Sequence, residues 1–156
     1  MIKYLSWVAV FLWMLLIFHF SHQPANVSSE LSGGVTDVIV NAVEKVIPIQ
    51  EVDVSNLNHM VRKNAHFFIY FVLGFLVIHA LRQGKVRGKW GIVFAMVICI
   101  LYAISDEVHQ IFIPGRSGEI RDVLIDTVGS TFGIGLYLLL NLINTKRSRQ
   151  KDKLAA

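Results

Sequence analysis

The sequence predicts an all-α fold: an integral membrane four-helix bundle with one further amphipathic helix on the extracytoplasmic side. Three observations predict it. Hydrophobic residues make up 54% of the chain and charged residues only 17%, which is more apolar than a typical soluble domain. Four apolar runs approach the length that crosses a bilayer. The basic residues gather in short segments beside these runs. A chain of 156 residues has room for a single domain.

The predicted spans occupy residues 4–20, 65–81, 90–113 and 120–143. The first is near the lower end of the ~17–25 residues that a spanning helix needs. We expect it to stay as a span and not to be cleaved as a signal peptide, because no small-residue cleavage site follows it in SHQPANVSS.

Between the first two spans, residues 35–47 carry apolar side chains at helical spacing until Pro48 ends the pattern. The sequence therefore predicts an amphipathic helix at about 35–47, which would lie in the membrane interface or cap the bundle.

The distribution of charge predicts the orientation in the membrane. Nine of the fifteen Lys and Arg residues lie in segments 82–89 and 146–153, each beside an apolar run. Because Lys and Arg are enriched on the cytoplasmic side, both segments are predicted to be cytoplasmic. An even number of spans then places both termini, including the basic tail 144–156, in the cytoplasm, and residues 21–64 and 114–119 outside.

The same distribution excludes two classes of function. The net charge of +4 is carried beside the spans and not over a soluble face, so no nucleic-acid partner is expected. The lone Cys99 excludes a disulfide framework and a cysteine-ligated zinc site within one chain.

Polar residues collect at the predicted outer face, above all in the stretch 105–126. Charged groups near the ends of membrane helices are costly unless they pair or serve a function. Asp106 lies three residues before His109 and four before Gln110, so the three share one helical face, and Asp122 and Asp126 are four apart. The candidate ligand-binding residues are Ser21, Gln23, Arg62, Lys63, His66, Tyr70, Asp106, Glu107, His109, Gln110, Arg116, Asp122 and Asp126.

Several roles for these residues remain open. Arg62 or Lys63 could pair with an acid and simply tie helices together. Catalytic candidates are His66, Asp106, His109 and Asp126. Ser21 could complete a Ser-His-Asp triad, but it lacks a nucleophile-elbow context. A carboxylate three residues before a His recurs in di-metal bundles, yet it occurs once here, so no metal site is assigned and a divalent metal is not favoured as a cofactor.

Four stretches carry a resemblance to a known family. They are FSHQP at 20–24, RKNAHFFIYFVLG at 62–74, YAISDEVHQIFIPGR at 102–116 and DVLIDTVGSTFG at 122–133. Together they touch all four predicted spans, and they resemble the VanZ-like membrane proteins. Relatives often carry a Glu three residues after the His of the second span, where this chain has Ile69.

The resemblance implies a multi-pass protein of the bacterial cytoplasmic membrane, in a family whose namesake is linked to teicoplanin tolerance. We expect the outer face to bind a polar lipid-linked cell-wall precursor or a lipoglycopeptide and so to contribute to glycopeptide tolerance. The alternative is a membrane-embedded enzyme that acts on a lipid-linked envelope substrate. In it, His66 or His109 would serve as base, Asp106 would orient it and Arg116 would stabilise negative charge.

Two further expectations concern transport and assembly. A transporter fits less well, because the polar residues gather at one end of the spans and do not thread through the bilayer. The lipid bilayer is the expected surrounding partner, and a second copy of the chain could associate through the close-packing pair Gly129 and Gly133.

Overall fold

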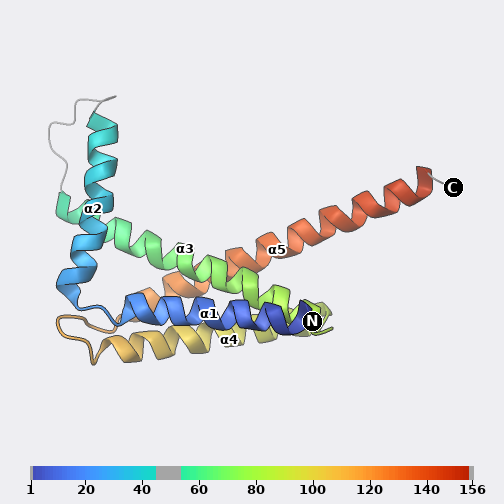
Figure 1. Cartoon of the computed structure of the whole chain (residues 1–156), viewed down its shortest axis with the longest axis horizontal. Helices are drawn as coiled ribbons and strands as arrows, with labels where there is room; N and C mark the ends of the chain where they lie inside the picture. The colour runs from blue at the N-terminus through green and yellow to red at the C-terminus, as the bar shows by residue number, and fades with distance from the viewer. Residues whose placement is uncertain (1, 45–53, 155–156) are drawn as a thin grey trace.

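A computed structural model describes residues 2–44 and 54–154, which form five helices and no strand (Figure 1). Four of the helices are long and apolar enough to cross a membrane. The predicted all-α membrane bundle is therefore confirmed. The helices are α1 (Ile2–Ser21), α2 (Ala25–Glu44), α3 (Val54–Gln83), α4 (Gly88–Gln110) and α5 (Ile120–Leu154).

Helix boundaries differ from the sequence-based expectation at several places. The amphipathic helix begins ten residues earlier than expected, at Ala25 and not at 35, while its expected last residues 45–47 lie outside the described part. The second spanning helix already begins at Val54. The last helix continues through the basic tail to Leu154.

The third spanning helix ends earlier than the apolar pattern suggested. The run extends to Ile113, but α4 stops at Gln110 and a turn follows, in which the Ile113 N–H donates to the Gln110 carbonyl at 3.0 Å. Pro114 disfavours helical geometry in the residue before it, so the apolar side chains at 111–113 belong to a loop. Ile113 is nonetheless buried, which fastens this loop to the bundle.

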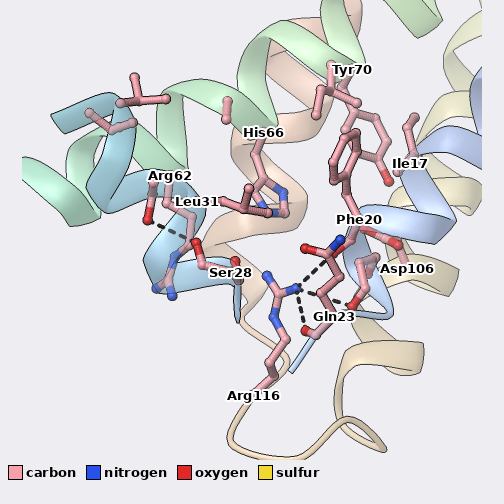
Figure 2. Close-up of a pocket in the computed structure, with 16 residues that line it drawn as sticks. Ile17, Phe20, Gln23, Ser28, Leu31, Arg62, His66, Tyr70, Asp106 and Arg116 are labelled. Carbon is pink, nitrogen blue, oxygen red and sulfur yellow. Dashed lines mark hydrogen bonds between the residues drawn. The ribbon is translucent and has the colours of Figure 1, made fainter. Parts of the chain in front are cut away.

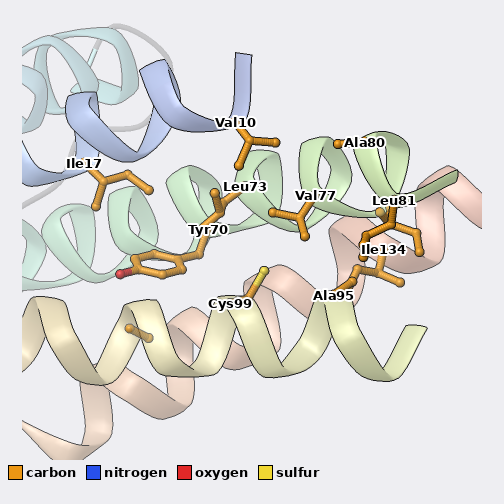
Figure 3. Packing of buried hydrophobic residues seen from close by; sticks show 12 residues of the cluster. Val10, Ile17, Tyr70, Leu73, Val77, Ala80, Leu81, Ala95, Cys99 and Ile134 are labelled. Carbon is orange, nitrogen blue, oxygen red and sulfur yellow. The ribbon is translucent and has the colours of Figure 1, made fainter. Parts of the chain in front are cut away.

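Helix α3 is the centre of the bundle and packs against each of the other four helices. The core lies between α1, α3, α4 and α5, and Figure 3 shows its side chains interdigitating along the bundle. Many outward-facing side chains on the spans are large and apolar, such as Phe11 and Leu101, each 61% exposed in the isolated chain. An outer surface of this kind suits contact with lipid.

Glycines allow α3 and α5 to lie unusually close. A methyl group added at Gly133 would overlap the carbonyl oxygen of Phe71, and one added at Gly129 would overlap the carbonyl oxygen of Phe67. From the opposite side, a methyl group at Gly74 would meet the backbone of Ser130. The Gly129–Gly133 pair thus packs against α3 of the same chain. This face is therefore not available for packing against a second copy.

Small residues also bring α4 against the core. Its buried side includes Gly91, Ala95, Cys99 and Ala103, spaced four residues apart. Continuing that spacing by one more turn reaches Glu107, so the helix face that packs in the core carries an acid into the interior at its end. The buried polar residues at the end of α4 thus continue the helix face that packs in the apolar core.

Helix α2 lies across one end of the bundle, the end where α1 and α4 finish, and its axis runs roughly perpendicular to α1 (Figure 1). Its start is joined to the loop after α4, because the Ala25 N–H donates to the Pro114 carbonyl at 3.3 Å. It packs on the first turns of α3, where the Asn58 amide donates to the Ser29 carbonyl at 3.4 Å. We call this end of the bundle the site end.

Candidate functional site

The candidate residues predicted from sequence lie at the site end: at the close of α1 and α4, in the loops after these helices, in the first half of α3 and in the opening turns of α5. The structure divides them into three groups: a buried acid cluster, an ion-pair group and residues that line a cavity. His109 belongs to none of the three, and Gln110 contacts the acid cluster through Asp106.

The acid cluster consists of His66, Asp106, Glu107 and Asp126, which come from α3, α4 and α5. One ligand atom from each of the four lies within 4.8 Å of the others. The three carboxylate residues are almost completely buried, with exposed fractions of 4%, 5% and 0% in chain order. Nδ1 of His66 lies 3.4 Å from Oδ1 of Asp126, at the distance of an ion pair when the imidazole is protonated.

Few of the carboxylate oxygens in the cluster accept a hydrogen bond. Gln110 donates to Oδ2 of Asp106 at 3.4 Å, and the backbone N–H of Glu119 donates to Oε2 of Glu107 at 2.8 Å. The remaining oxygens, Oδ1 of Asp106, Oε1 of Glu107 and both of Asp126, accept no hydrogen bond from the residues that the structure describes. Buried polar groups are normally paired, so these oxygens indicate a place built for something other than helix packing alone.

The buried hydroxyl of Tyr70 is another polar group without a hydrogen-bond partner among the described residues. It is 1% exposed, has no hydrogen-bond partner among residues 2–44 and 54–154, and points along the bundle toward the site end (Figure 3).

Lys63 forms the ion-pair group with the start of α5. Its Nζ donates to Oδ1 of Asp122 at 2.8 Å and to Oε2 of Glu119 at 3.3 Å. The pairing of Lys63 with an acid of the fourth span, considered from the sequence as helix glue, is therefore present. Lys63 therefore pairs with Asp122 and Glu119 and not with a carboxylate of the acid cluster.

Arg116 turns back over the end of α1. Its Nη1 donates to the carbonyls of Phe20, Ser21 and Gln23 at 3.4, 3.2 and 3.5 Å. A cation at this position is favourable, because the last carbonyls of a helix lack partners and carry partial negative charge. Burial lowers the pKa of the Arg116 guanidinium from its ordinary value, and the positive charge of nearby Arg62 acts in the same direction.

His109 points away from the acids that precede it on α4. Its ring lies against Phe18, with centroids 4.6 Å apart, and its Nε2 is 3.1 Å from Nδ1 of His22. No contact joins His109 to Asp106 among the described residues, because three-residue spacing allows a shared face but does not force both side chains into one site. The imidazole that reaches the acids is that of His66, from another helix.

A partly open cavity of about 310 Å³ lies beside the cluster (Figure 2). Its polar wall includes Ser21, Gln23, Arg62, His66, Tyr70, Asp106 and Arg116, all predicted from the sequence. Its apolar wall includes Ile17, Phe20, Leu31, Val35, Val61 and Ile69. Two arginine side chains and an apolar surface thus border the same space.

Sequence reasoning missed two parts of the site. The cavity wall that α2 supplies, including Ser28 and Leu31, fell in a segment read as loop. Pro24 directly before the first helical residue was a usable signal for an earlier helix start. Glu119 was also missed as a partner of Lys63, although it directly precedes the first residue of α5.

Comparison with known proteins identifies the family. The family model described as VanZ/LLP1 matches residues 6–141, which include all four spanning helices almost completely. The chain belongs to the VanZ/LLP1 family. The family resemblance read from the sequence motifs is thereby confirmed.

A curated relative agrees with this assignment. The chain is 37% identical over 91 residues to a protein of Bacillus subtilis (strain 168) called the uncharacterized membrane protein YwnJ. The match covers 58% of this chain and 55% of the relative, so the VanZ/LLP1 chain matches about half of that protein's length. No solved structure matches. Together with the four apolar helices, these similarities make the chain a multi-pass membrane protein.

Proposed function

We propose that this VanZ/LLP1 protein binds an amphipathic envelope molecule with an anionic head group, either a lipid-linked cell-wall precursor or a lipoglycopeptide. We place the binding site on the extracytoplasmic side of the bacterial cytoplasmic membrane, with both termini in the cytoplasm. Binding there would contribute to tolerance of glycopeptides such as teicoplanin.

The single observation that carries this proposal is the mixed wall of the 310 Å³ cavity. Arg62 and Arg116 border it together with apolar side chains such as Phe20 and Leu31. Guanidinium groups bind carboxylate and phosphate by paired, charge-assisted hydrogen bonds. An apolar wall beside them suits the first part of a lipid chain. Nη1 of Arg116 already donates hydrogen bonds to carbonyls of α1. Arg62, by contrast, forms no hydrogen bond or ion pair with the described residues.

The size of the cavity limits what can enter. A volume of about 310 Å³ is at the small end of ligand pockets, which range from roughly 300 to 1,000 Å³. It accommodates a head group or a short length of chain but not a whole glycopeptide. The proposed ligand therefore inserts one end while the remainder lies in the bilayer or above it.

Charge supports the proposed orientation. The segment 82–89 and the C-terminal half of α5 carry the clustered basic residues, at the end of the bundle opposite the cavity. The positive-inside tendency places that end in the cytoplasm and the cavity outside.

Arg62→Gln tests the binding proposal. We expect the variant to bind a polyprenyl phosphate at least about tenfold more weakly, because a charge-assisted hydrogen bond to an anion contributes about 1.5–3 kcal/mol. Binding is measured by titrating the purified chain in lipid nanodiscs. In cells that express it, the same variant should lose any increase in teicoplanin tolerance that the parent confers.

The matched control is Arg121→Gln. Arg121 is exposed in the first turn of α5 and does not line the cavity, so this variant should bind like the parent. Equal binding by the parent and Arg62→Gln, or equal losses in both variants, would contradict the proposed role of the cavity.

An enzyme is the second candidate, favoured by the pairing of the partly buried His66 with the buried Asp126 beside the cavity. In this reading Asp126 orients the imidazole of His66, which acts as general base toward a lipid-linked substrate. Incubating the purified chain with lipid-linked precursors should then yield products of changed mass. His66→Gln should slow their formation by at least about 100-fold, while His109→Gln leaves it unchanged. An unaltered lipid profile with the parent protein would exclude this reading.

A further inference from the structure

We propose that His66, Asp106, Glu107 and Asp126 form a site for one divalent first-row cation of the Mn²⁺, Fe²⁺ or Zn²⁺ type. The metal site does not depend on the identity of the ligand proposed above. It is argued from the positions of the donor atoms, the charge balance around them and their unpartnered oxygens.

The donor atoms are close enough to share an ion. Metal–ligand bonds of about 2.0–2.2 Å join donors that are at most about 4.4 Å apart on opposite sides of the ion. The four donor atoms here lie within 4.8 Å of one another, and neighbouring donors on one ion are about 3–3.6 Å apart, so closing the site needs shifts of roughly 1 Å. Rotation of carboxylate side chains supplies shifts of that size without movement of the helices.

The charge of three ionised carboxylates in the cluster is balanced only in part by a protonated His66. Three carboxylates meet in the bundle interior, where an uncompensated charge is costly. Lys63 pairs with Asp122 and Glu119, and Arg116 donates to backbone carbonyls, so neither base contacts these carboxylates. A divalent cation would reduce the charge of three ionised carboxylates from −3 to −1 and satisfy their free oxygens at once.

The free oxygens are the second, independent indication of a ligand. Neither oxygen of Asp126 accepts a hydrogen bond from the described residues, on a side chain that is 0% exposed, and the one close polar contact, from Nδ1 of His66 at 3.4 Å, reaches Oδ1 alone. The hydroxyl of Tyr70, on a side chain that is 1% exposed, also lacks a partner among the described residues and points toward this end of the bundle, so it suits a hydrogen bond to a coordinating oxygen. Helix packing alone leaves these groups unexplained.

The donor set selects the class of metal. One imidazole with three carboxylates suits Mn²⁺, Fe²⁺ and Zn²⁺, whereas Mg²⁺ and Ca²⁺ favour sites built from oxygen alone. His66 and Asp106 also line the cavity, so one side of the ion would face it. An anionic oxygen of a bound molecule could complete the coordination there, a step that does rest on the proposed function.

The test measures metal alone. The full chain is purified in detergent with a tag that contains no histidine, stripped with a chelator, incubated with Zn²⁺ or Mn²⁺ and desalted. Mass spectrometry of the elements should find about one ion per chain, and thermal unfolding of the parent should shift to higher temperature with the metal. Asp126→Asn, which keeps the side-chain shape, should bind at least about tenfold more weakly and lose the thermal shift.

Two controls separate this site from other donors. Glu119→Gln removes a neighbouring carboxylate outside the cluster and should keep the metal. The double variant His22→Gln, His109→Gln removes the exposed histidine pair and should keep it too. Less than about 0.1 ion per chain in the parent, equal binding by Asp126→Asn, or loss of metal in the histidine variant would each overturn the proposal. Failure of the Arg62 test with metal retained would contradict only the proposed ligand.

Discussion

Gly133→Ala should lower the free energy of unfolding by about 3 kcal/mol, the upper range for overpacking a tight interior. The added methyl group would overlap the carbonyl oxygen of Phe71 and press on the backbone nitrogen of Phe75. Backbone atoms of a central helix cannot rotate away as a side chain can, so α3 and α5 must separate. Because α3 and α5 carry His66 and Asp126, the separation should also open the acid cluster.

Unfolding in mixed detergent micelles, followed by circular dichroism, measures the effect. The matched control is Gly135→Ala, two residues along the same helix, where an added methyl group meets nothing within 4 Å. This variant should be unchanged or more stable by about 0.5–1 kcal/mol, because alanine favours helix. Equal destabilisation of both variants would contradict the close α3–α5 contact and point to a general effect of side-chain size.

Lys63→Met should cost about 2 kcal/mol of stability and loosen the start of α5. Removal of the ammonium leaves Asp122, whose side chain is 13% exposed, as an uncompensated carboxylate beside the acid cluster. Breaking a fully buried pair costs about 3–5 kcal/mol, and the partial exposure of Lys63, 21%, reduces that figure. The same unfolding measurement gives the value, and limited proteolysis reports on residues 111–119.

Asp122→Asn in the Lys63→Met background provides the control. If the ion pair is the cause, the second substitution should recover more than half of the lost stability, since the unpaired charge is gone. Additive losses in the double variant would show instead that the two side chains act separately.

Much of the fold could be predicted because the signals are local. The length and apolarity of a run predict a span without reference to the rest of the chain. Four consecutive spans then bring alternate connections to the same end, which places Ser21, His66, Asp106 and Asp126 together. The misplaced boundaries have local causes as well, since Pro114 ends α4 inside an apolar stretch.

The candidate site could be predicted only as a set of residues. The sequence left His66 and His109 open as alternatives beside Asp106, while the structure brings His66 to the acids and turns His109 to His22. Spacing along one helix says which residues share a face but not which way that face is turned. Arg116 was expected to stabilise negative charge at the site, yet in the structure it donates to the carbonyls of Phe20, Ser21 and Gln23.

The amino-acid sequence by itself determined the four spans, the single polar end and the family to which the chain belongs. Each follows from hydropathy and motifs read in order along the chain. Only the tertiary structure decided that three carboxylates and one imidazole converge, with Lys63 held apart from them by Asp122 and Glu119. The physical reason is helix rotation: small residues on α4 and glycines between α3 and α5 set how each helix turns toward its neighbours.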